Sequence, residues 1–238
     1  MTVEVPTEKT EVKGLYGRLA EVVCRRAFSS PEALAYELSI APSLAKIVAP
    51  EFIARVRGDR ILDVGCGGGI ISEFITNQLN ATVIGIDPSP SQIRRVARRS
   101  RKSAGLLGVQ ARAEGIPFAD NSFDSVVSSC AFKHWPDGHL GIAECLRVVR
   151  VGGVVIIVEI DGSSTRAEFW RFARKSRIPL GMRKAYVRFA MRTVVGVAPT
   201  NDELVNCIAR SSDEFEVSVI SNTPFHIAII TKSEQSTV

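Results

Sequence analysis

The stretch ILDVGCGGGI, residues 61–70, decides the fold that this chain is expected to adopt. An apolar run ends in Asp63 and Val64, and glycines follow at positions 65, 67, 68 and 69. This order is typical of a strand that enters a tight turn and then a helix, where backbone atoms can approach a bound nucleotide. The glycines follow G-x-G-x-G, because Ile70 stands where the dinucleotide pattern G-x-G-x-x-G has its last glycine. The missing last glycine is expected if the ligand has no pyrophosphate, and also if the stretch is a plain strand–helix turn without a ligand.

A carboxylate in the next segment favours a nucleoside ligand. Asp87 ends the apolar run of VIGIDPSPSQI, residues 83–93, and follows Gly65 by 22 positions (87 minus 65). A carboxylate at the end of a second strand, at this spacing, can accept hydrogen bonds from both ribose hydroxyls. Ser89 and Pro90 are typical of the cap and first turn of the helix that follows.

Strand and helix patterns alternate outward from these two segments. Apolar runs at 60–64, 82–86, 108–112, 123–128 and 152–159 predict strands, and 70–79, 90–103 and 138–149 predict the helices between them. Such alternation predicts an α/β protein with a parallel sheet that is buried on both faces. Thr200 and Glu203 form a capping-box pattern for a further helix, and two strand-like runs separated by SNTPF predict a terminal antiparallel hairpin.

Composition excludes several classes of protein. The chain has 238 residues, 45% of them hydrophobic, and its five cysteines are an odd number without a CxxC pair. This favours reduced thiols in a cytoplasmic protein over a disulfide framework or a zinc site, and the three histidines do not have metal-ligand spacing, so no metal is expected. The N-terminus lacks the apolar centre of a secretion signal, and no apolar run approaches the ~20 residues of a membrane-spanning helix.

The third informative stretch, ARAEGIPFADNSFDSVVSSCAFKHW at 111–135, completes a family pattern. With LDVGCGGG, IGIDPS and LRVVRVGGVVIIVE it resembles the class I S-adenosylmethionine-dependent methyltransferases, in the branch similar to the ubiquinone- and menaquinone-biosynthesis C-methyltransferases. The resemblance covers about residues 58–160. It implies a Rossmann-like seven-stranded, mostly parallel sheet with an antiparallel last strand and helices on both faces, S-adenosylmethionine as cofactor, and methyl transfer by in-line displacement to a small-molecule acceptor.

The resemblance also implies roles for single residues and a domain plan. Asp63, with the backbone of Gly65, Cys66 and Gly67, would line the methionine half of the cofactor, and Ser129 would lie near the reacting methyl. Asp87 would hold the ribose. The adenine would contact Pro88 or Ser89, and also Ala113. We expect a flexible tail at 1–12, an N-terminal helical cap at 13–57, the methyltransferase domain at 58–232 with a helical lid insertion at 164–199, and a tail at 233–238.

One departure from the family pattern affects adenine recognition. Arg112 stands where the family commonly has an acidic residue that bonds the adenine amine, and a guanidinium can only donate. Either Glu114 or a backbone carbonyl takes over this bond, or adenine recognition is weakened. Arg112 supports one alternative to an active methyltransferase, a catalytically inactive S-adenosylmethionine-binding partner protein. A second alternative, an NAD(P)-dependent oxidoreductase, also stays open, although Ile70 disfavours it.

The segment FKHWPD after the fourth strand supplies the candidate for acid–base chemistry. His134 is the best-placed titratable group, and it serves either as a general base or as pocket lining that packs against Trp135. Trp135 either walls the acceptor pocket or anchors the helix behind it, and the second interpretation is favoured. Lys133 is expected to be a solvated neighbour.

The positive charge is concentrated in two places. Residues 93–102 carry six basic and no acidic side chains, and residues 166–192 carry nine basic and one acidic, in a chain of net charge +5. Two helices broken near Pro179 and Gly181 are expected in the second segment, with Phe169, Phe172 and Ala173 on one face of the first helix. The second helix is expected to carry a basic stripe (Lys184, Arg188, Arg192) and an apolar stripe (Met182, Phe189, Ala190).

Three interpretations of this basic lid remain: a solvated face, which is favoured, recognition of an anionic acceptor, or peripheral contact with an anionic membrane. Nucleic acid is disfavoured as a partner. The run SSCAFKHW lacks the Asn-Pro-Pro-aromatic motif of methyltransferases that act on base nitrogens, and the chain shows no nucleic-acid-binding module.

Overall fold

The computed structural model describes residues 41–176, 178–212 and 214–234. The expected tail at 1–12, the part of the helical cap before residue 41 and the last four residues lie outside this range. Within it, helix α3 (Ala41–Ile53) is the described part of the expected cap. No helix in the described part of the chain has the length and apolar character needed to cross a bilayer.

A seven-stranded sheet forms the centre of the molecule, in the order β3-β2-β1-β4-β5-β7-β6. Its strands are β1 (Arg60–Val64), β2 (Thr82–Asp87), β3 (Leu106–Gln110), β4 (Phe123–Ser129), β5 (Val149–Ile160), β6 (Phe215–Val219) and β7 (Phe225–Thr231). The pairs among β1 to β5 are parallel, whereas β7 runs antiparallel to both β5 and β6. The expected parallel sheet and its terminal antiparallel hairpin are thus confirmed.

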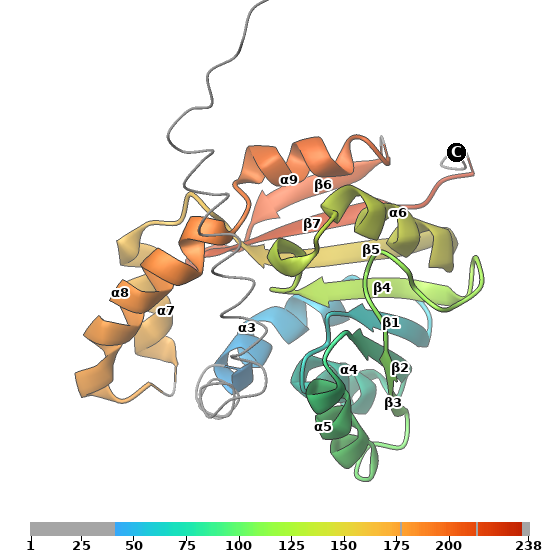
Figure 1. Ribbon diagram of the computed structural model, residues 1–238, viewed down its shortest axis with the longest axis horizontal. Coiled ribbons are helices and arrows are strands. Elements are labelled where there is room, and N and C mark those ends of the chain that lie inside the picture. Colours follow the sequence, from blue (N-terminus) through green and yellow to red (C-terminus); the bar gives the residue numbers. More distant parts are fainter. Residues whose placement is uncertain (1–40, 177, 213, 235–238) are drawn as a thin grey trace, which may run out of the picture.

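Helices cover both faces of this sheet (Figure 1). One core cluster joins the sheet to α3, α4 (Ile70–Leu79), α5 (Pro90–Ser100) and the lid helices. The other joins it to α6 (Gly138–Val148) and α9 (Asn201–Ile208). β5 lies between the two clusters, and its residues from 153 to 160 are all buried, as expected for a strand covered on both faces.

Two expected strand bounds are wrong. β3 begins at Leu106 and not at 108, because the fully buried Leu106 is a core residue of this strand, and the chain leaves the sheet after Gln110 pairs with Asp87. β5 begins at Val149 and not at 152, because a register shift against β4 lets Val149 pair with Phe123 before the main ladder starts. The other strands and helices lie within three residues of their expected bounds.

The lid consists of α7 (Arg166–Lys175), the 3-10 helix η2 (Leu180–Met182), α8 (Arg183–Thr193) and the 3-10 helix η3 (Val195–Val197). Figure 1 shows α7 and α8 side by side next to the carboxyl ends of β4 and β5. Phe169, Phe172 and Ala173 of α7 are buried as expected. The expected capping box of α9 is present, and Thr165 with Glu168 forms a second one at α7, from a T-x-x-E pattern that the sequence already contains.

Candidate active site

The glycine loop after β1 is a tight turn held against the neighbouring strand. The N–H groups of Gly65 and Cys66 both donate to the carbonyl of Ile86, at 2.8 and 3.0 Å. Gly65 has a φ of 77° and Gly67 a φ of 53°, a region that favours glycine. A Cβ on Gly65 would lie 2.3 Å from Cβ of Ala131, so the loop after β4 packs directly on this turn. The loop therefore contributes its shape, because these N–H groups are already engaged within the protein.

Asp87 links the glycine loop to the start of α5. Its Oδ2 accepts from the N–H of Gly67 at 3.0 Å, and its Oδ1 accepts from the N–H of Ser89 at 2.9 Å. Burial raises the pKa of Asp87, and these two N–H groups oppose the increase. Each carboxylate oxygen keeps a second lone pair, so the group can still accept from two vicinal hydroxyls.

The cap expected at Ser89 differs in detail. Ser89 occupies the N-cap position of α5 and Pro90 follows, but the Ser89 side chain makes no capping bond. Its Oγ lies 2.8 Å from Oγ of Ser91. Pro88 accepts from the side chain of Gln110 through its carbonyl, at 3.2 Å. Pro88 and Ser89 thus directly follow Asp87 where β2 ends and α5 begins.

Asp63 is a buried carboxyl group beneath the glycine loop. It is 2% exposed, and Oγ of Ser72 donates to its Oδ2 at 2.5 Å. The pKa of Asp63 is raised to about 7, mainly because the group is buried. The hydrogen bond from Ser72 lowers this pKa, and the negative charge of Asp87 raises it further. A cationic group in this site would relieve the cost of the buried negative charge. Cys66 packs against Gly85, where a Cβ would come within 2.7 Å of its Sγ, which explains a small residue at each position.

β4 ends in a strained turn that sequence reasoning did not predict. Oγ of Ser129 is buried and has no nitrogen or oxygen hydrogen-bond partner among the described residues. Cys130 follows with a φ of 53°, which is uncommon for a residue with a side chain. Its N–H donates to the carbonyl of Val158 at 2.7 Å, so β5 holds the turn in place.

The loop expected to meet the adenine lies beyond β3. Ala113 is buried, whereas Arg112 is exposed and forms an isolated bridge with Gly115. Glu114 accepts from the N–H of Asp137 at 3.4 Å, and Asp137 caps α6. Glu114 is the acidic side chain of this loop, while the Arg112 side chain lies at the surface.

His134 and Trp135 follow in the 3-10 helix η1 (Phe132–His134) and its cap. Trp135 packs on α6, because a Cβ on Gly141 would lie 2.4 Å from its ring, and it meets Phe132 edge to face at 5.1 Å. These contacts support the favoured interpretation of Trp135 as a helix anchor. His134 is an exposed residue as a whole, but protein atoms surround its ring. The pKa of His134 is lowered to about 4, mainly because these atoms desolvate the charged imidazole and secondarily because the positive charge of Lys133 lies nearby. The imidazole is therefore neutral at pH 7.

The expectation of a solvated Lys133 is wrong. Its side chain is 5% exposed, and its Nζ lies 2.8 Å from Oε1 of Glu159, whose side chain is fully buried near the end of β5. Nζ also donates to the carbonyl of Cys130, and the N–H of Lys133 donates to Oε2 of Glu159 at 3.1 Å. The ion pair thus holds the strained turn at Cys130. Glu159 was missed because it reads as the polar end of an apolar strand.

The site residues gather at the carboxyl ends of three neighbouring strands. Asp63 lies in β1, Asp87 ends β2 and Ser129 ends β4, and parallel strands bring their carboxyl ends to one edge of a sheet. His226 of β7 is fully buried directly opposite Glu159, and its ring nitrogens have no hydrogen-bond partner in the described structure. Among the residues described, no three His, Cys, Asp or Glu side chains gather as metal ligands.

Comparison with known proteins agrees with this geometry. Residues 62–157 match the family model described as a methyltransferase domain. A ubiquinone biosynthesis O-methyltransferase of Rhizobium johnstonii is 30% identical over 128 residues, which are 53% of this chain and 51% of that protein. A 2-methyl-6-phytyl-1,4-hydroquinone methyltransferase of Oryza sativa subsp. japonica is 35% identical over 100 residues, 42% of this chain and 28% of that protein. The matched part of the chain thus spans about half the length of the Rhizobium relative.

The fold has a close counterpart among solved structures. The plantazolicin methyltransferase BpumL, in complex with a pentazolic desmethylPZN analog and SAH, superposes with a TM-score of 0.68 at 15% identity, covering 93% of this chain and 99% of that chain. At this identity the likeness shows the fold alone. Residues 62–157 thus match a methyltransferase domain, and the chain shares its fold with this solved methyltransferase.

Proposed function

We propose that this protein transfers a methyl group from S-adenosylmethionine to a small-molecule acceptor. The observation that carries the proposal is the convergence of Asp63, Asp87 and Ser129 at one sheet edge, around a glycine turn. The residues present fit the cofactor. Asp87 has lone pairs for two ribose hydroxyls, the buried Oγ of Ser129 has no nitrogen or oxygen partner among the described groups, and Asp63 is a buried carboxyl that suits a cationic ligand.

Space is available where the cofactor would lie. A Cβ on Gly67 would approach its nearest neighbour, Nε2 of Gln92, to no closer than 4.0 Å, so the surface above this turn is open. The resemblance implies that Gly65, Cys66 and Gly67 line the methionine half there. Ala113, with Pro88 or Ser89, would contact the adenine, and Glu114 would accept from its amine in place of the residue that Arg112 replaces.

The protein's own contribution to methyl transfer is alignment and exclusion of water. When bound, S-adenosylmethionine would supply a methyl group on a positively charged sulfur, which would keep the carbon–sulfur electron pair on transfer of the methyl to the acceptor. Ser129 and the glycine turn would hold the cofactor end of this alignment, and the loop that carries His134 would meet the acceptor. If the acceptor is a hydroxyl, a neutral His134 takes up its proton, and a pKa near 4 makes it a weak base for this step.

An amphipathic acceptor is the best-supported choice. The names of the relatives point to quinone-type and phytyl-bearing ring substrates for those proteins. We propose the same broad class here, in a cytoplasmic protein, which agrees with the free thiols at the four described cysteines.

Calorimetric titration with S-adenosylmethionine and with NAD separates this proposal from an oxidoreductase. Asp87→Ala should weaken S-adenosylmethionine binding more than tenfold, because two hydroxyls lose a charged acceptor worth about 1.5–3 kcal/mol. Asp59→Ala, at an exposed carboxylate outside the site, is the matched control and should bind normally. Formation of S-adenosylhomocysteine with a panel of phenolic and quinol acceptors then separates an enzyme from an inactive binding protein. Binding of NAD alone, or unchanged affinity in folded Asp87→Ala, would refute the assignment.

A further inference from the structure

The two lid helices carry the strongest unbalanced charge in the molecule. The α7–α8 hairpin, residues 166–193, contains nine Lys and Arg residues and one acidic residue, Glu168. Glu168 is occupied in the capping box of α7, where it accepts from the N–H and the hydroxyl of Thr165 at 2.7 and 2.8 Å. Glu168 offsets only one of these nine positive charges, so the hairpin keeps a net charge of +8 (nine minus one).

The basic stripe expected on α8 is exposed. Lys184, Arg188 and Arg192 are all exposed, and none of them forms an ion pair with a carboxylate in the part of the chain that the structure describes. Residues four positions apart lie on one face of a helix, so the three charges form one row. A row of this kind suits a partner that presents negative charge over an area.

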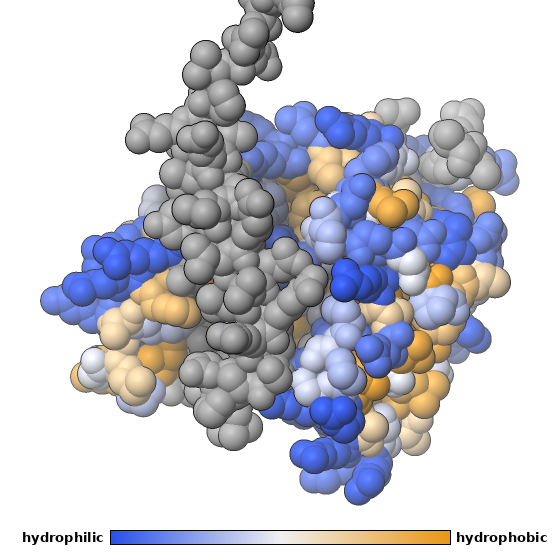
Figure 2. All heavy atoms as spheres, in the orientation of Figure 1, coloured by the Kyte–Doolittle hydropathy of each residue, from blue (hydrophilic) through white to orange (hydrophobic). Residues whose placement is uncertain are grey.

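Apolar side chains lie beside these charges, in a different arrangement from the one expected. Ala190 is fully buried against the core with Val187, so it does not belong to an exposed apolar stripe with Met182 and Phe189. The exposed apolar residues are instead Leu180 at 79%, Met182 at 62%, Phe189 at 57% and Trp170 at 41%. Figure 2 shows hydrophobic and hydrophilic residues side by side on the lid, at the left of the molecule.

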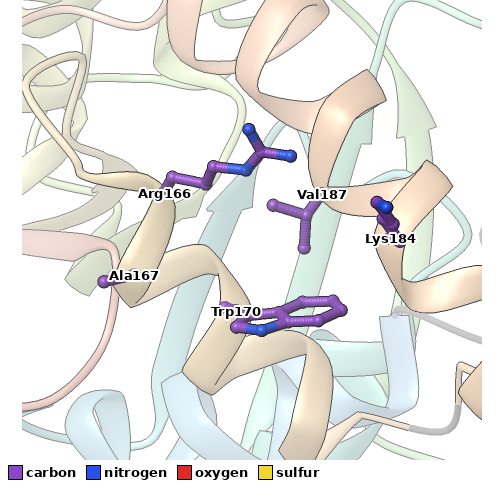
Figure 3. A pocket seen from close by; sticks show the side chains of 5 residues that line it. All are labelled: Arg166, Ala167, Trp170, Lys184 and Val187. Atoms are coloured by element: carbon purple, nitrogen blue, oxygen red, sulfur yellow. The ribbon is translucent and has the colours of Figure 1, made fainter.

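A shallow hollow between the two helices combines the same two chemistries. Its volume is about 350 Å³, and its lining residues are Arg166, Ala167, Trp170, Lys184 and Val187. In Figure 3, Arg166 reaches from α7 toward α8, and the Trp170 ring faces Val187. A second hollow of about 360 Å³ is lined by Arg166, Arg188, Met191 and Arg192. Cations beside apolar walls match the headgroup and acyl chain of an anionic lipid.

The hairpin also lies next to the candidate site. α7 follows the carboxyl end of β5, and Tyr186 of α8 packs against the same core cluster as Cys130, the residue after Ser129. A surface that holds the hairpin would therefore lie close to the candidate site.

We propose that the α7–α8 hairpin docks this protein on the surface of membranes that contain anionic lipids. Exposed apolar side chains with neighbouring Lys and Arg residues are typical of segments that lie in the interface plane, with apolar groups in the acyl boundary and cations at the phosphates. Leu180 and Met182 at the η2 tip would enter the interface, and the stripe on α8 would meet the headgroups. Docking does not depend on methyl transfer, so it is tested separately from the proposed function.

The test is co-sedimentation of the full chain with vesicles of phosphatidylcholine alone or with added phosphatidylserine. We expect binding to the anionic vesicles only, and release at about 1 M salt, where the screening length is about 3 Å. Joint replacement of Lys184, Arg188 and Arg192 by alanine should weaken binding on the order of 100-fold, since each cation near such a surface contributes ~1 kcal/mol. Leu180→Ser with Met182→Ser should weaken it about tenfold or more.

Helix α5 provides the matched control. Arg94, Arg98 and Lys102 are exposed on or just after α5, and their joint replacement by alanine removes the same charge from a different basic surface. This variant should sediment like the wild type, and circular dichroism should show that all variants fold. Absence of binding to anionic vesicles, or equal loss in the α5 variant, would overturn the proposal. Full binding by the serine pair would refute the entry of Leu180 and Met182 into the interface.

Discussion

The substitution Lys133→Met tests the buried ion pair that supports the candidate site. It removes the ammonium that lies 2.8 Å from Oε1 of Glu159 and leaves that carboxylate, 0% exposed, with two N–H donors and no cation at this distance. Removing one partner of a buried pair costs about 3–5 kcal/mol. For a chain of this size, a loss of that magnitude lowers the melting temperature by about 6–20 °C. Urea unfolding followed by circular dichroism measures the loss in the free energy of unfolding, and thermal unfolding measures the change in melting temperature.

The pH dependence gives a second signature of the same substitution. Burial alone would raise the pKa of Glu159, but the Lys133 ammonium and the surrounding N–H donors outweigh it and lower that pKa. A lowered folded-state pKa stabilises the wild type above the unfolded value of about 4.3, and this contribution is lost as pH falls through the folded value. Without Lys133, burial dominates and the pKa of Glu159 rises. As pH falls from 7 to 5, the variant should therefore gain more stability than the wild type, in which Glu159 stays ionised.

Two further variants make this reasoning refutable. Lys133→Met with Glu159→Gln removes both charges and should recover more than half of the loss, because no unpaired charge stays buried. Lys102→Met replaces an exposed lysine and should change stability by no more than about 0.5 kcal/mol. A loss below about 1 kcal/mol for Lys133→Met, or a double variant as unstable as the single one, would show that the pair does not stabilise the fold.

Three other predictions concern the site and its scaffold. His134→Ala should slow methyl transfer by about 10²-fold with little change in cofactor affinity if His134 is the base, and the wild-type rate should show no histidine limb between pH 6 and 8, because its pKa is about 4; near-normal turnover in the variant would leave His134 as pocket lining. The affinity for S-adenosylmethionine should fall about tenfold or more between pH 7.5 and 5.5, because Asp63, of pKa about 7, becomes protonated and no longer offers a negative charge to the cationic cofactor. Calorimetric titration of the Asp63→Asn variant should show no such dependence on pH. Thr200→Ala should cost about 1 kcal/mol in thermal unfolding by removing the capping box of α9, whereas an unchanged melting temperature would show that the cap is dispensable.

The sheet could be predicted from the sequence because each of its strands has a local signal. β1 and β2 are apolar runs that end at Asp63 with its glycines and at Asp87, and the terminal hairpin is marked by two runs around SNTPF. The expected bounds of β3 differ from those in the structure because its apolar pattern is weak. One residue of the strand, Leu106, is fully buried, and Leu107 beside it is 50% exposed. A short strand at the sheet edge with one fully buried core residue gives little periodicity from which to assign its ends.

The support of the site could not be predicted, because it depends on contacts between distant segments. Lys133 and Glu159 are 26 positions apart, and neither has a neighbour in the sequence that indicates a buried partner. The strained backbone of Cys130 likewise has no signal, since glycine or asparagine would be the usual residue at such a φ. By contrast, Asp63, Asp87 and Ser129 each end or follow an apolar run, so a parallel sheet alone brings them to one edge.

The position of the ion pair explains why a charged pair is present at this point of the core. Cys130 holds a left-handed conformation that costs roughly 1–2 kcal/mol, so the turn needs contacts that keep it there. Val158 accepts from its N–H, Lys133 donates to its carbonyl, and Glu159 fixes Lys133. The same turn connects Ser129, which we propose on the cofactor side, to the segment of His134, which we propose on the acceptor side. An apolar pair could fill this space, but it could not bond the Cys130 carbonyl. The charge is therefore explained by the geometry of the turn and not by stability alone.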